Sequence, residues 1–417
     1  MDNQELLKQI LKIGKEMLRC GAEVARAEDS LTRIFRSYGF TSIDIWVISS
    51  SIQVTVETAE GQMLTETCAI QDNGIDYDRL DRLNALSRGI CAQTPSVEEI
   101  DRRLREILAR PEPKAVWEYL GAILGCSGFS VSFGCGSVDL IVSALAAVVL
   151  TFLARFIRRH ESNTIVYNFI ISFFVALLIN YTINAGLGSN AVAVLIGMVM
   201  LLISGLSTTN GLRDLLHRDT ISGILNISSS LVGATGIALG ITLSLLIVGV
   251  DEVAPLSAVP AVNEILGSTV ACIGFALLFR FWRAKCLWSA FGAFLMISIY
   301  RIAMRFSLPL LEAVIIASAF AGFYAQIMAR INKTPSTAFL TIAVLPIIPG
   351  AKLFYMMYYI VNSEFDKARS AGADMLLVCL GIALGFLFID VTLKYLTLFL
   401  QWIKRGVENR RGAKEAK

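Results

Sequence analysis

The pattern of apolar and polar positions divides the chain near residue 114. Between residues 43 and 70 apolar and polar side chains alternate, in a segment rich in Val, Ile and Thr, which predicts two or three antiparallel strands. Apolar residues recur at helical spacing on both sides of that segment. They do so in 4–23, 26–40, 76–90 and 96–110. The pattern predicts an α+β domain over residues 1–114, closed by Pro111 and Pro113.

Beyond residue 114 the apolar stretches become long enough to cross the roughly 30 Å hydrocarbon core of a bilayer. They lie at 116–135, 137–157, 164–185, 190–206, 221–249, 260–281, 285–304, 308–330, 338–361 and 373–401. We therefore expect a polytopic α-helical membrane protein with about ten transmembrane helices.

Charge follows the same division. Residues 1–114 contain 34 charged side chains and the remaining 303 residues only 37, although soluble proteins carry about a quarter. The net charge is +3, and no basic patch with interleaved aromatic residues occurs, so a nucleic-acid partner is not expected. The eight cysteines form no CxxC pair, so we interpret them as apolar packing residues and expect no metal site or cofactor.

The short loops indicate the orientation in the membrane. Loops after even-numbered helices contain Lys and Arg, in "RFIRRH", "GLRDLLHR", "RFWRAK" and "RINK". Loops after odd-numbered helices read "CGS", "AGLGSN" and "DEVAPLSAVPAVNE" and have neither. Positive charge concentrates on the cytoplasmic side of short loops. The pattern predicts a multi-pass protein of the cytoplasmic membrane with both termini in the cytoplasm.

A weak internal repeat relates the two halves of the membrane region. Gly205 and Gly350 are each followed 31 residues later by "GIALG", at 236–240 and 381–385, so one offset of 145 aligns both pairs. We expect two halves of five helices, 115–250 and 251–417. An odd number of helices per half inverts the second copy, an arrangement in which transporters bind substrate at the repeat interface.

The fourth helix of each half contains a helix-weakening pair, Ser204–Gly205 in the first half and Pro349–Gly350 in the second. Irregular backbone at membrane depth must lie inside protein or line a watery cavity. We expect a broken helix in each half, with polar side chains converging on a substrate. The candidates are Asn210, Arg213, Asp214, Asp139, Pro349, Gly350, Lys352 and Tyr355. A cytoplasmic loop with an amphipathic helix is the alternative for 204–219.

Several motifs together resemble the threonine/serine exporter family. They are "GAEVARAED" (21–29), "FGCGSVDL" (133–140), "TTNGLRDLLHRD" (208–219), "MARINKTPSTAF" (328–339) and "LPIIPGAKLFY" (345–355). The resemblance covers nearly the whole chain, as a fusion of two halves that some members encode separately. The chain departs from the family at Ser204, where a proline usually precedes the glycine.

The resemblance implies a secondary exporter of threonine and serine, driven by the proton or the membrane potential. The resemblance also implies an alternative, because some relatives handle dicarboxylates such as succinate, whose carboxylates would suit Arg213 and Lys352 equally well. The charged cluster of Glu23, Arg26, Glu28 and Asp29 in the N-terminal domain could instead belong to a membrane-anchored enzyme or sensor. We expect no enzyme, because no nucleophile–base pair accompanies the cluster, and assign these residues to a structural or gating contact. Assembly as a homo-oligomer stays open.

Three further charged residues complete the expectations. Asp139 begins the second helix and has either a substrate or proton role or that of a helix N-cap. Asp390 and Lys394 are spaced i,i+4 within the last helix, which predicts an internal ion pair.

Overall fold

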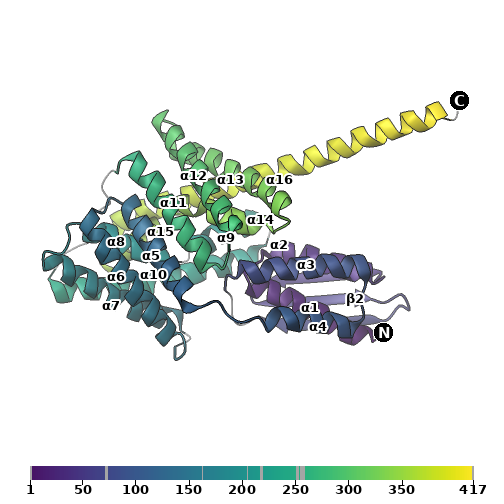
Figure 1. Ribbon diagram of the computed structural model, residues 1–417, viewed down its shortest axis with the longest axis horizontal. Helices are drawn as coiled ribbons and strands as arrows, with labels where there is room; N and C mark the ends of the chain where they lie inside the picture. Colours follow the sequence, from purple (N-terminus) through teal and green to yellow (C-terminus); the bar gives the residue numbers. More distant parts are fainter. Residues whose placement is uncertain are drawn as a thin grey trace.

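The structure is a computed structural model, and it describes residues 2–70, 74–161, 163–203, 205–216, 219–249, 253 and 259–415. Side chains are described for all of these except 205, 206 and 397–415. The N-terminal region and a larger bundle of helices lie side by side, and the C-terminal part of the last helix, α16, extends away from both (Figure 1).

The N-terminal region has the predicted α+β composition, with four helices and a three-stranded sheet. Its elements are α1 (Asn3–Arg19), α2 (Val24–Ser37), β1 (Ser42–Ile48), β2 (Ser51–Glu57), β3 (Met63–Ala69), α3 (Tyr77–Gln93) and α4 (Val97–Leu108). The strands are antiparallel in the order β1-β2-β3, with Ile45 opposite Val54 and Val54 opposite Glu66.

Local signals in the sequence set the ends of these helices. Asp76 and Ser96 each accept a hydrogen bond from the third residue beyond them, so they cap α3 and α4. Gly21 and Gly39, at φ +89° and +82°, follow α1 and α2, where a left-handed residue ends a helix at little steric cost. The alternating strands bury Ile52, one of the residues in the core beneath the helices.

The remaining helices form the bundle. They are α5 (Ala115–Ser132), α6 (Ser137–Ile157), α7 (Thr164–Asn184), α8 (Ala191–Leu202), α9 (Gly205–Leu216), α10 (Thr220–Val248), α11 (Ala261–Leu278), α12 (Ala284–Arg305), α13 (Leu310–Asn332), α14 (Ser336–Val344), the 3-10 turn η1 (Leu345–Ile347), α15 (Gly350–Val361) and α16 (Phe365–Glu415).

Seven helices of the described chain are long and apolar enough to cross a membrane, or nine if each of two bent pairs is one span. The chain is therefore a polytopic helical membrane protein, but the predicted count of ten is not confirmed. The first expected span is α5, which is not among the nine. Its eighteen residues include Glu118 and three serines, which lower its hydropathy.

Both bent pairs are the predicted fourth helices. In the first half, Ala191–Leu202 and Ser207–Leu216 meet at 53°, and in the second, Ser336–Ile347 and Gly350–Val361 meet at 54°. The helices α9 and α15 begin at Gly205 and Gly350, which are 145 positions apart, as the repeat predicts. Ser204, the other residue expected at the first break, lies outside the described residues.

The helices α5 and α11 pack through reciprocal glycine contacts. A Cβ atom added to Gly128 would lie 2.7 Å from the Gly267 carbonyl oxygen, and one added to Gly274 would lie 2.5 Å from that of Gly121. Early residues of one helix contact late residues of the other, so the two helices run antiparallel. Gly267 and Gly274 of α11 lie 146 positions after Gly121 and Gly128 of α5. The two contacts are therefore equivalent, because each joins the earlier glycine of one helix to the later glycine of the other.

The two "GIALG" segments also occupy corresponding places. Gly240 on α10 packs against Ser172 on α7, and Gly385 on α16 packs against Ser318 on α13. Because glycine has no side chain, the backbones of each helix pair approach closely, as small residues allow in membrane bundles.

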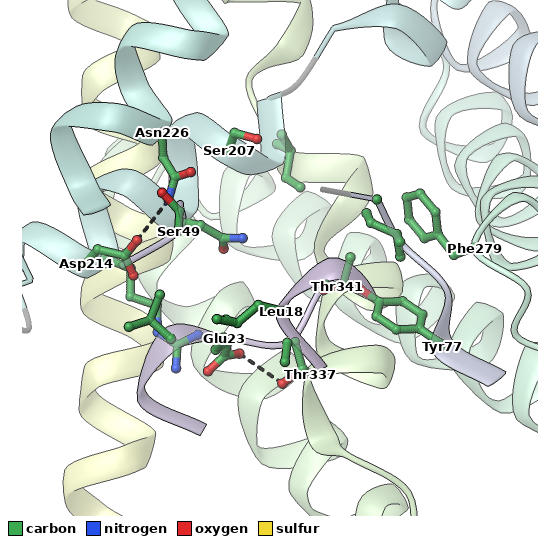
Figure 2. A pocket seen from close by; sticks show the side chains of 18 of the residues that line it. Leu18, Glu23, Ser49, Tyr77, Ser207, Asp214, Asn226, Phe279, Thr337 and Thr341 are labelled. Atoms are coloured by element: carbon green, nitrogen blue, oxygen red, sulfur yellow. Dashed lines mark hydrogen bonds and ion pairs between the residues drawn. The ribbon is translucent and has the colours of Figure 1, made fainter. Parts of the chain in front are cut away.

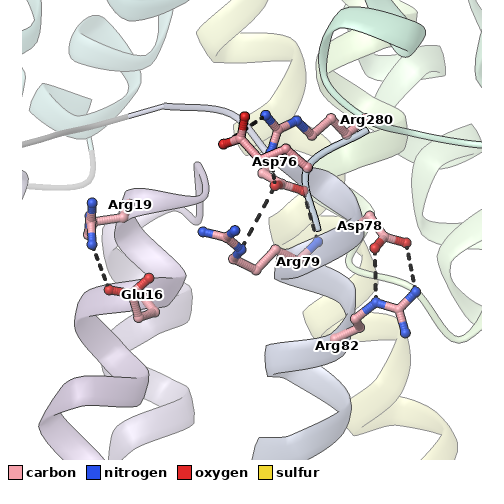
Figure 3. A network of polar contacts seen from close by, with 8 residues as sticks. Glu16, Arg19, Asp76, Asp78, Arg79, Arg82 and Arg280 are labelled. Carbon is pink, nitrogen blue, oxygen red and sulfur yellow. Dashed lines mark hydrogen bonds and ion pairs between the residues drawn. The ribbon is translucent and has the colours of Figure 1, made fainter. Parts of the chain in front are cut away.

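The N-terminal region is attached to the bundle at the turn between α11 and α12. Arg280 donates to Asp76 at 2.8 Å (Figure 3). Lys285, at the start of α12, donates to Asp81 at 2.9 Å. The Tyr77 amide donates to the Phe279 carbonyl at 2.9 Å, and the Tyr77 ring packs edge-on against Phe279. These contacts place the start of α3 directly against the bundle.

Candidate functional site

A cavity of about 780 Å³ lies where the N-terminal region meets both broken helices. From the N-terminal region it is lined by the α1–α2 turn, the start of α2 and residues near the start of α3; the bundle supplies α8 to α11, α14, α15 and α16. Its charged lining residues are Glu23, Arg26, Asp29, Arg213, Asp214, Asp219 and Asp390. Figure 2 shows these elements converging around one space.

The α9 helix supplies a polar wall that contains three predicted residues together with Ser207, which the sequence does not single out. Ser207, Asn210, Arg213 and Asp214 all line the cavity. Asn210 follows Ser207 by three residues, and Arg213 and Asp214 follow Asn210 by three and four, so all four lie toward one side of α9. Asn226 on α10 donates to the Asp214 carboxylate at 3.0 Å, which fixes that side chain (Figure 2).

Arg213 is held between carboxylates from two other parts of the chain. Its guanidinium lies 2.9 Å from Glu23 of the N-terminal region and 3.4 Å from Asp390 on α16. It also lies 5.5 Å from the centre of the Phe386 ring, within the range of a cation–π contact. Arg213 thus joins the first broken helix, the last helix and the N-terminal region in one ion cluster.

Glu23 reaches this cluster from the turn between α1 and α2. Besides pairing with Arg213, it accepts a hydrogen bond from Thr337 on α14 at 3.1 Å (Figure 2). It also lies 3.8 Å from Arg26. Burial alone would raise the pKa of Glu23, but the charges of Arg213 and Arg26 and the hydrogen bonds from Arg213 and Thr337 outweigh it and lower the pKa to about 2. Glu23 is therefore ionised throughout the physiological pH range.

The break in the second half borders the same space. Gly350 lines the cavity, and an added Cβ there would lie 2.8 Å from the Met200 sulfur and 2.9 Å from Ile203, at the end of α8. The two breaks therefore contact each other. Pro349 is the N-cap residue of α15 and does not line the cavity itself.

Lys352 and Tyr355, predicted beside Gly350, point elsewhere. Lys352 donates to Asp374 at 2.9 Å, outside the cavity lining. Tyr355 is buried in the bundle and stacks on Tyr359. The two side chains follow Gly350 by two and five residues, and neither lies on the face of α15 that meets the cavity.

Asp139 lies apart from the cavity and holds two turns together. Its carboxylate accepts hydrogen bonds from the amides of Gly136 at 2.8 Å, Ser189 at 2.7 Å and Asn190 at 3.3 Å. It therefore stabilises the start of α6 from the third helical position, where Gly136 and not Asp139 is the N-cap residue, and it anchors the connection between α7 and α8.

Of the remaining members of the predicted N-terminal cluster, two line the cavity and Glu28 does not. Arg26 lines the cavity and donates to Ser336 at the start of α14. Asp29 also lines the cavity, and it pairs with Arg33 within α2 at 2.9 Å. Glu28 is exposed outside the lining, and partial burial together with nearby Asp219 raises its pKa.

Several residues of the site are not identified from the sequence, among them Ser207, Asp219 and Asn226 and the four residues that follow. Asp390 contacts Arg213 rather than forming the pair predicted from its spacing to Lys394, because i,i+4 spacing alone does not show what faces the helix. Thr337 and Thr341 line the cavity from α14, and Tyr77 lies beside Thr341 (Figure 2). Two threonines spaced i,i+4 in an apolar helix are a signal that could have identified this face.

Two family models match this chain. One, described as "Putative threonine/serine exporter", matches residues 8–248, and the other, described as "Threonine/Serine exporter, ThrE", matches residues 264–392. The chain belongs to the threonine/serine exporter family. It is a fusion of the two halves, as the sequence motifs indicated.

The transporter's cavity collects residues from both matched regions. Glu23, Arg213 and Asp214 come from the first, and Thr337, Gly350 and Asp390 come from the second. No curated protein and no solved structure matches the chain. Within the described residues, no three His, Cys, Asp or Glu side chains are placed to hold a metal ion.

Proposed function

We propose that this transporter is a secondary active exporter of threonine and serine, driven by the proton motive force, and that its substrate binds in the cavity between the two broken helices. The observation that carries the proposal is the convergence of Arg213, Asp214 and Gly350 on one space from separate halves of the chain. An amino acid needs a cation or amides for its carboxylate and a carboxylate for its ammonium group. Arg213 serves the first need and Asp214 the second.

The charge of the cavity favours a zwitterion over a dicarboxylate. Among its described lining residues, five are Asp or Glu and two are Arg. Arg213 already has two carboxylate partners, so a dianion such as succinate would bring further negative charge into an acidic space. Uncompensated charge in a partly buried site is costly. Threonine and serine bring no net charge, and their hydroxyl groups can hydrogen-bond with Asn210 or Thr341.

The proposed topology has both termini in the cytoplasm of a cell whose cytoplasmic membrane contains the bundle. In support, the N-terminal region contacts Arg280 and Lys285 in one positively charged loop and Lys333 in another, where Arg88 donates to the Lys333 carbonyl at 3.2 Å. Those loops and the N-terminal region then face the same side, and the cavity lies between the bundle and the cytoplasmic N-terminal region.

We also propose ten spans in two inverted halves, 115–250 and 251–417, with α5 as the tenth span. The antiparallel packing of α5 and α11 supports this, because corresponding residues meet reciprocally. Two antiparallel helices with reciprocal contacts between corresponding residues are related by a twofold axis perpendicular to both helices. Such an axis lies in the membrane plane, as in inverted-repeat transporters.

In this account, residues 1–114 form a cytoplasmic cap that closes the cavity through Glu23 and Arg26. A cap of this kind explains why Glu23 contacts Arg213 and Thr337 of the bundle and why Arg26 contacts Ser336. The alternative of an enzyme or sensor anchored by the helices gives no reason for two corresponding broken helices.

Transport in inverted membrane vesicles tests the proposed function. We expect vesicles containing the protein to accumulate labelled threonine and serine when energised, more than vesicles without it, and to lose this accumulation when an uncoupler dissipates the proton gradient. Labelled succinate, in the same vesicles, is the comparison. Accumulation of succinate with none of threonine or serine would contradict the proposal.

A further inference from the structure

Glu23 occupies the N-cap position of α2 without capping that helix. An N-cap side chain ordinarily accepts a hydrogen bond from the amide two or three residues further on. The Glu23 side chain makes no such bond and instead reaches Arg213 and Thr337 across the cavity wall. Its carboxylate therefore pairs with Arg213 on the first broken helix and makes no hydrogen bond to the backbone amides of α2.

The partner of Glu23 is the group that the proposed function assigns to the substrate. Arg213 is the cation of the α9 wall, and its side chain is only 16% exposed. A carboxylate 2.9 Å away therefore takes up one face of the guanidinium that an incoming carboxylate would need.

We infer that Glu23 is an internal substitute for the substrate carboxylate, which displaces it from Arg213 when the substrate binds. This inference rests on the proposed function and adds a residue that sets affinity for substrate. The exchange replaces one carboxylate on Arg213 by another, so the charge around the guanidinium is unchanged and Arg213 is never left buried without a partner.

The structure also provides a place for the displaced Glu23. Arg26 lies 3.8 Å from the Glu23 carboxylate, one turn along α2, and its side chain is 43% exposed. Glu23 can pair with Arg26 after it leaves Arg213. Gly21, at φ +89° in the turn before it, gives the backbone a residue that tolerates unusual conformations.

Displacement of Glu23 has a consequence for the cap. Glu23 links α2 to both α9 and α14, through Arg213 and Thr337. When the substrate takes Arg213, the cap loses its ion pair with α9 and retains the Arg26 contact with Ser336. Substrate binding therefore loosens the start of α2 from the bundle.

The test compares full-length wild type with Glu23→Gln, which keeps the size of the side chain and removes its charge. Glu28→Gln is the matched control, because it makes the same change on the same helix outside the cavity lining. Three probes are titrated into the purified protein: L-threonine, L-threoninamide, which lacks the carboxylate, and acetate, which has a carboxylate alone. Affinity is measured by calorimetry, and hydrogen exchange is followed at the amides of residues 22–27.

We expect Glu23→Gln to bind threonine about tenfold more tightly than wild type, since a charged competitor is removed. Threoninamide should bind both proteins equally, and Glu28→Gln should behave as wild type. In wild type, threonine and acetate should both raise exchange at residues 22–27, which also tests the inference if the variant does not fold.

Two results would overturn the inference. One is equal or weaker threonine binding in Glu23→Gln; the other is unchanged exchange at residues 22–27 with both threonine and acetate. A third result separates the inference from the proposed function. If acetate raises hydrogen exchange at residues 22–27 while threonine neither binds nor raises it, a carboxylate still displaces Glu23 from Arg213 and the proposed substrate is wrong.

Discussion

Replacing Arg213 by Gln is expected to reduce threonine transport at least about tenfold without removing the protein from the membrane. The substitution takes the cation from the α9 wall and leaves Glu23 and Asp390 facing each other without it. Truncating one partner of a buried, hydrogen-bonded charge pair costs about 2–5 kcal/mol, which corresponds to well over tenfold in binding. Asp214→Asn should reduce transport similarly, by removing the carboxylate proposed for the ammonium group.

Lys352→Gln is the matched control for this prediction. Lys352 is a cation on the second broken helix, in the position corresponding to Ser207, and its partner Asp374 lies outside the cavity lining. We expect it to transport at nearly the wild-type rate, measured in energised vesicles at equal expression. Full transport by both Arg213→Gln and Asp214→Asn would mean that α9 is only a connection between spans.

Adding one methyl group to the α5–α11 contact is expected to destabilise the bundle strongly. In Gly274→Ala the new Cβ would lie 2.5 Å from the Gly121 carbonyl oxygen and against the Gly125 amide. These are backbone atoms, so the two helices must separate along their contact. Overpacking of this kind costs about 1–3 kcal/mol, occasionally more.

Gly322→Ala on α13 makes the same chemical change where there is room. Its added Cβ would lie 3.5 Å from the nearest atom, on Ile389, an ordinary contact. Alanine also favours a helix over glycine by up to about 1 kcal/mol. Thermal unfolding in detergent should therefore show a lower midpoint for Gly274→Ala and an unchanged or higher one for Gly322→Ala. Equal midpoints would show that α5 and α11 do not pack as closely as described.

The elements of the fold could be predicted where one segment carries its own signal. The N-terminal helices and strands follow from periodicity, and the glycines that end α1 and α2 are visible in the sequence. The two broken helices were predicted from Gly205 and Pro349–Gly350. The number of spans does not follow from length alone, because Glu118 and the serines lower the hydropathy of α5 and it is not among the candidate spans of the described chain.

The site could be predicted only in part, because contacts between distant segments leave no local pattern. Helical spacing places Asn210, Arg213 and Asp214 on one face, but it does not show that Glu23 and Asp390 meet Arg213 from either side. Lys352 was predicted by proximity to Gly350 in sequence. A helix turns by about 100° per residue, so a neighbour two positions away faces a different direction.

The central claim is that substrate occupies the cavity between the two broken helices and the cap. Ser207 lines that cavity one turn before Asn210, and Thr65 lies exposed on β3, away from it. With Ser207→Cys in a cysteine-free background, threonine at a concentration that saturates transport should slow alkylation by a maleimide, whereas Thr65→Cys should react at the same rate with or without threonine. Alkylation of Ser207→Cys at an unchanged rate, in a variant that still transports threonine, would contradict the claim.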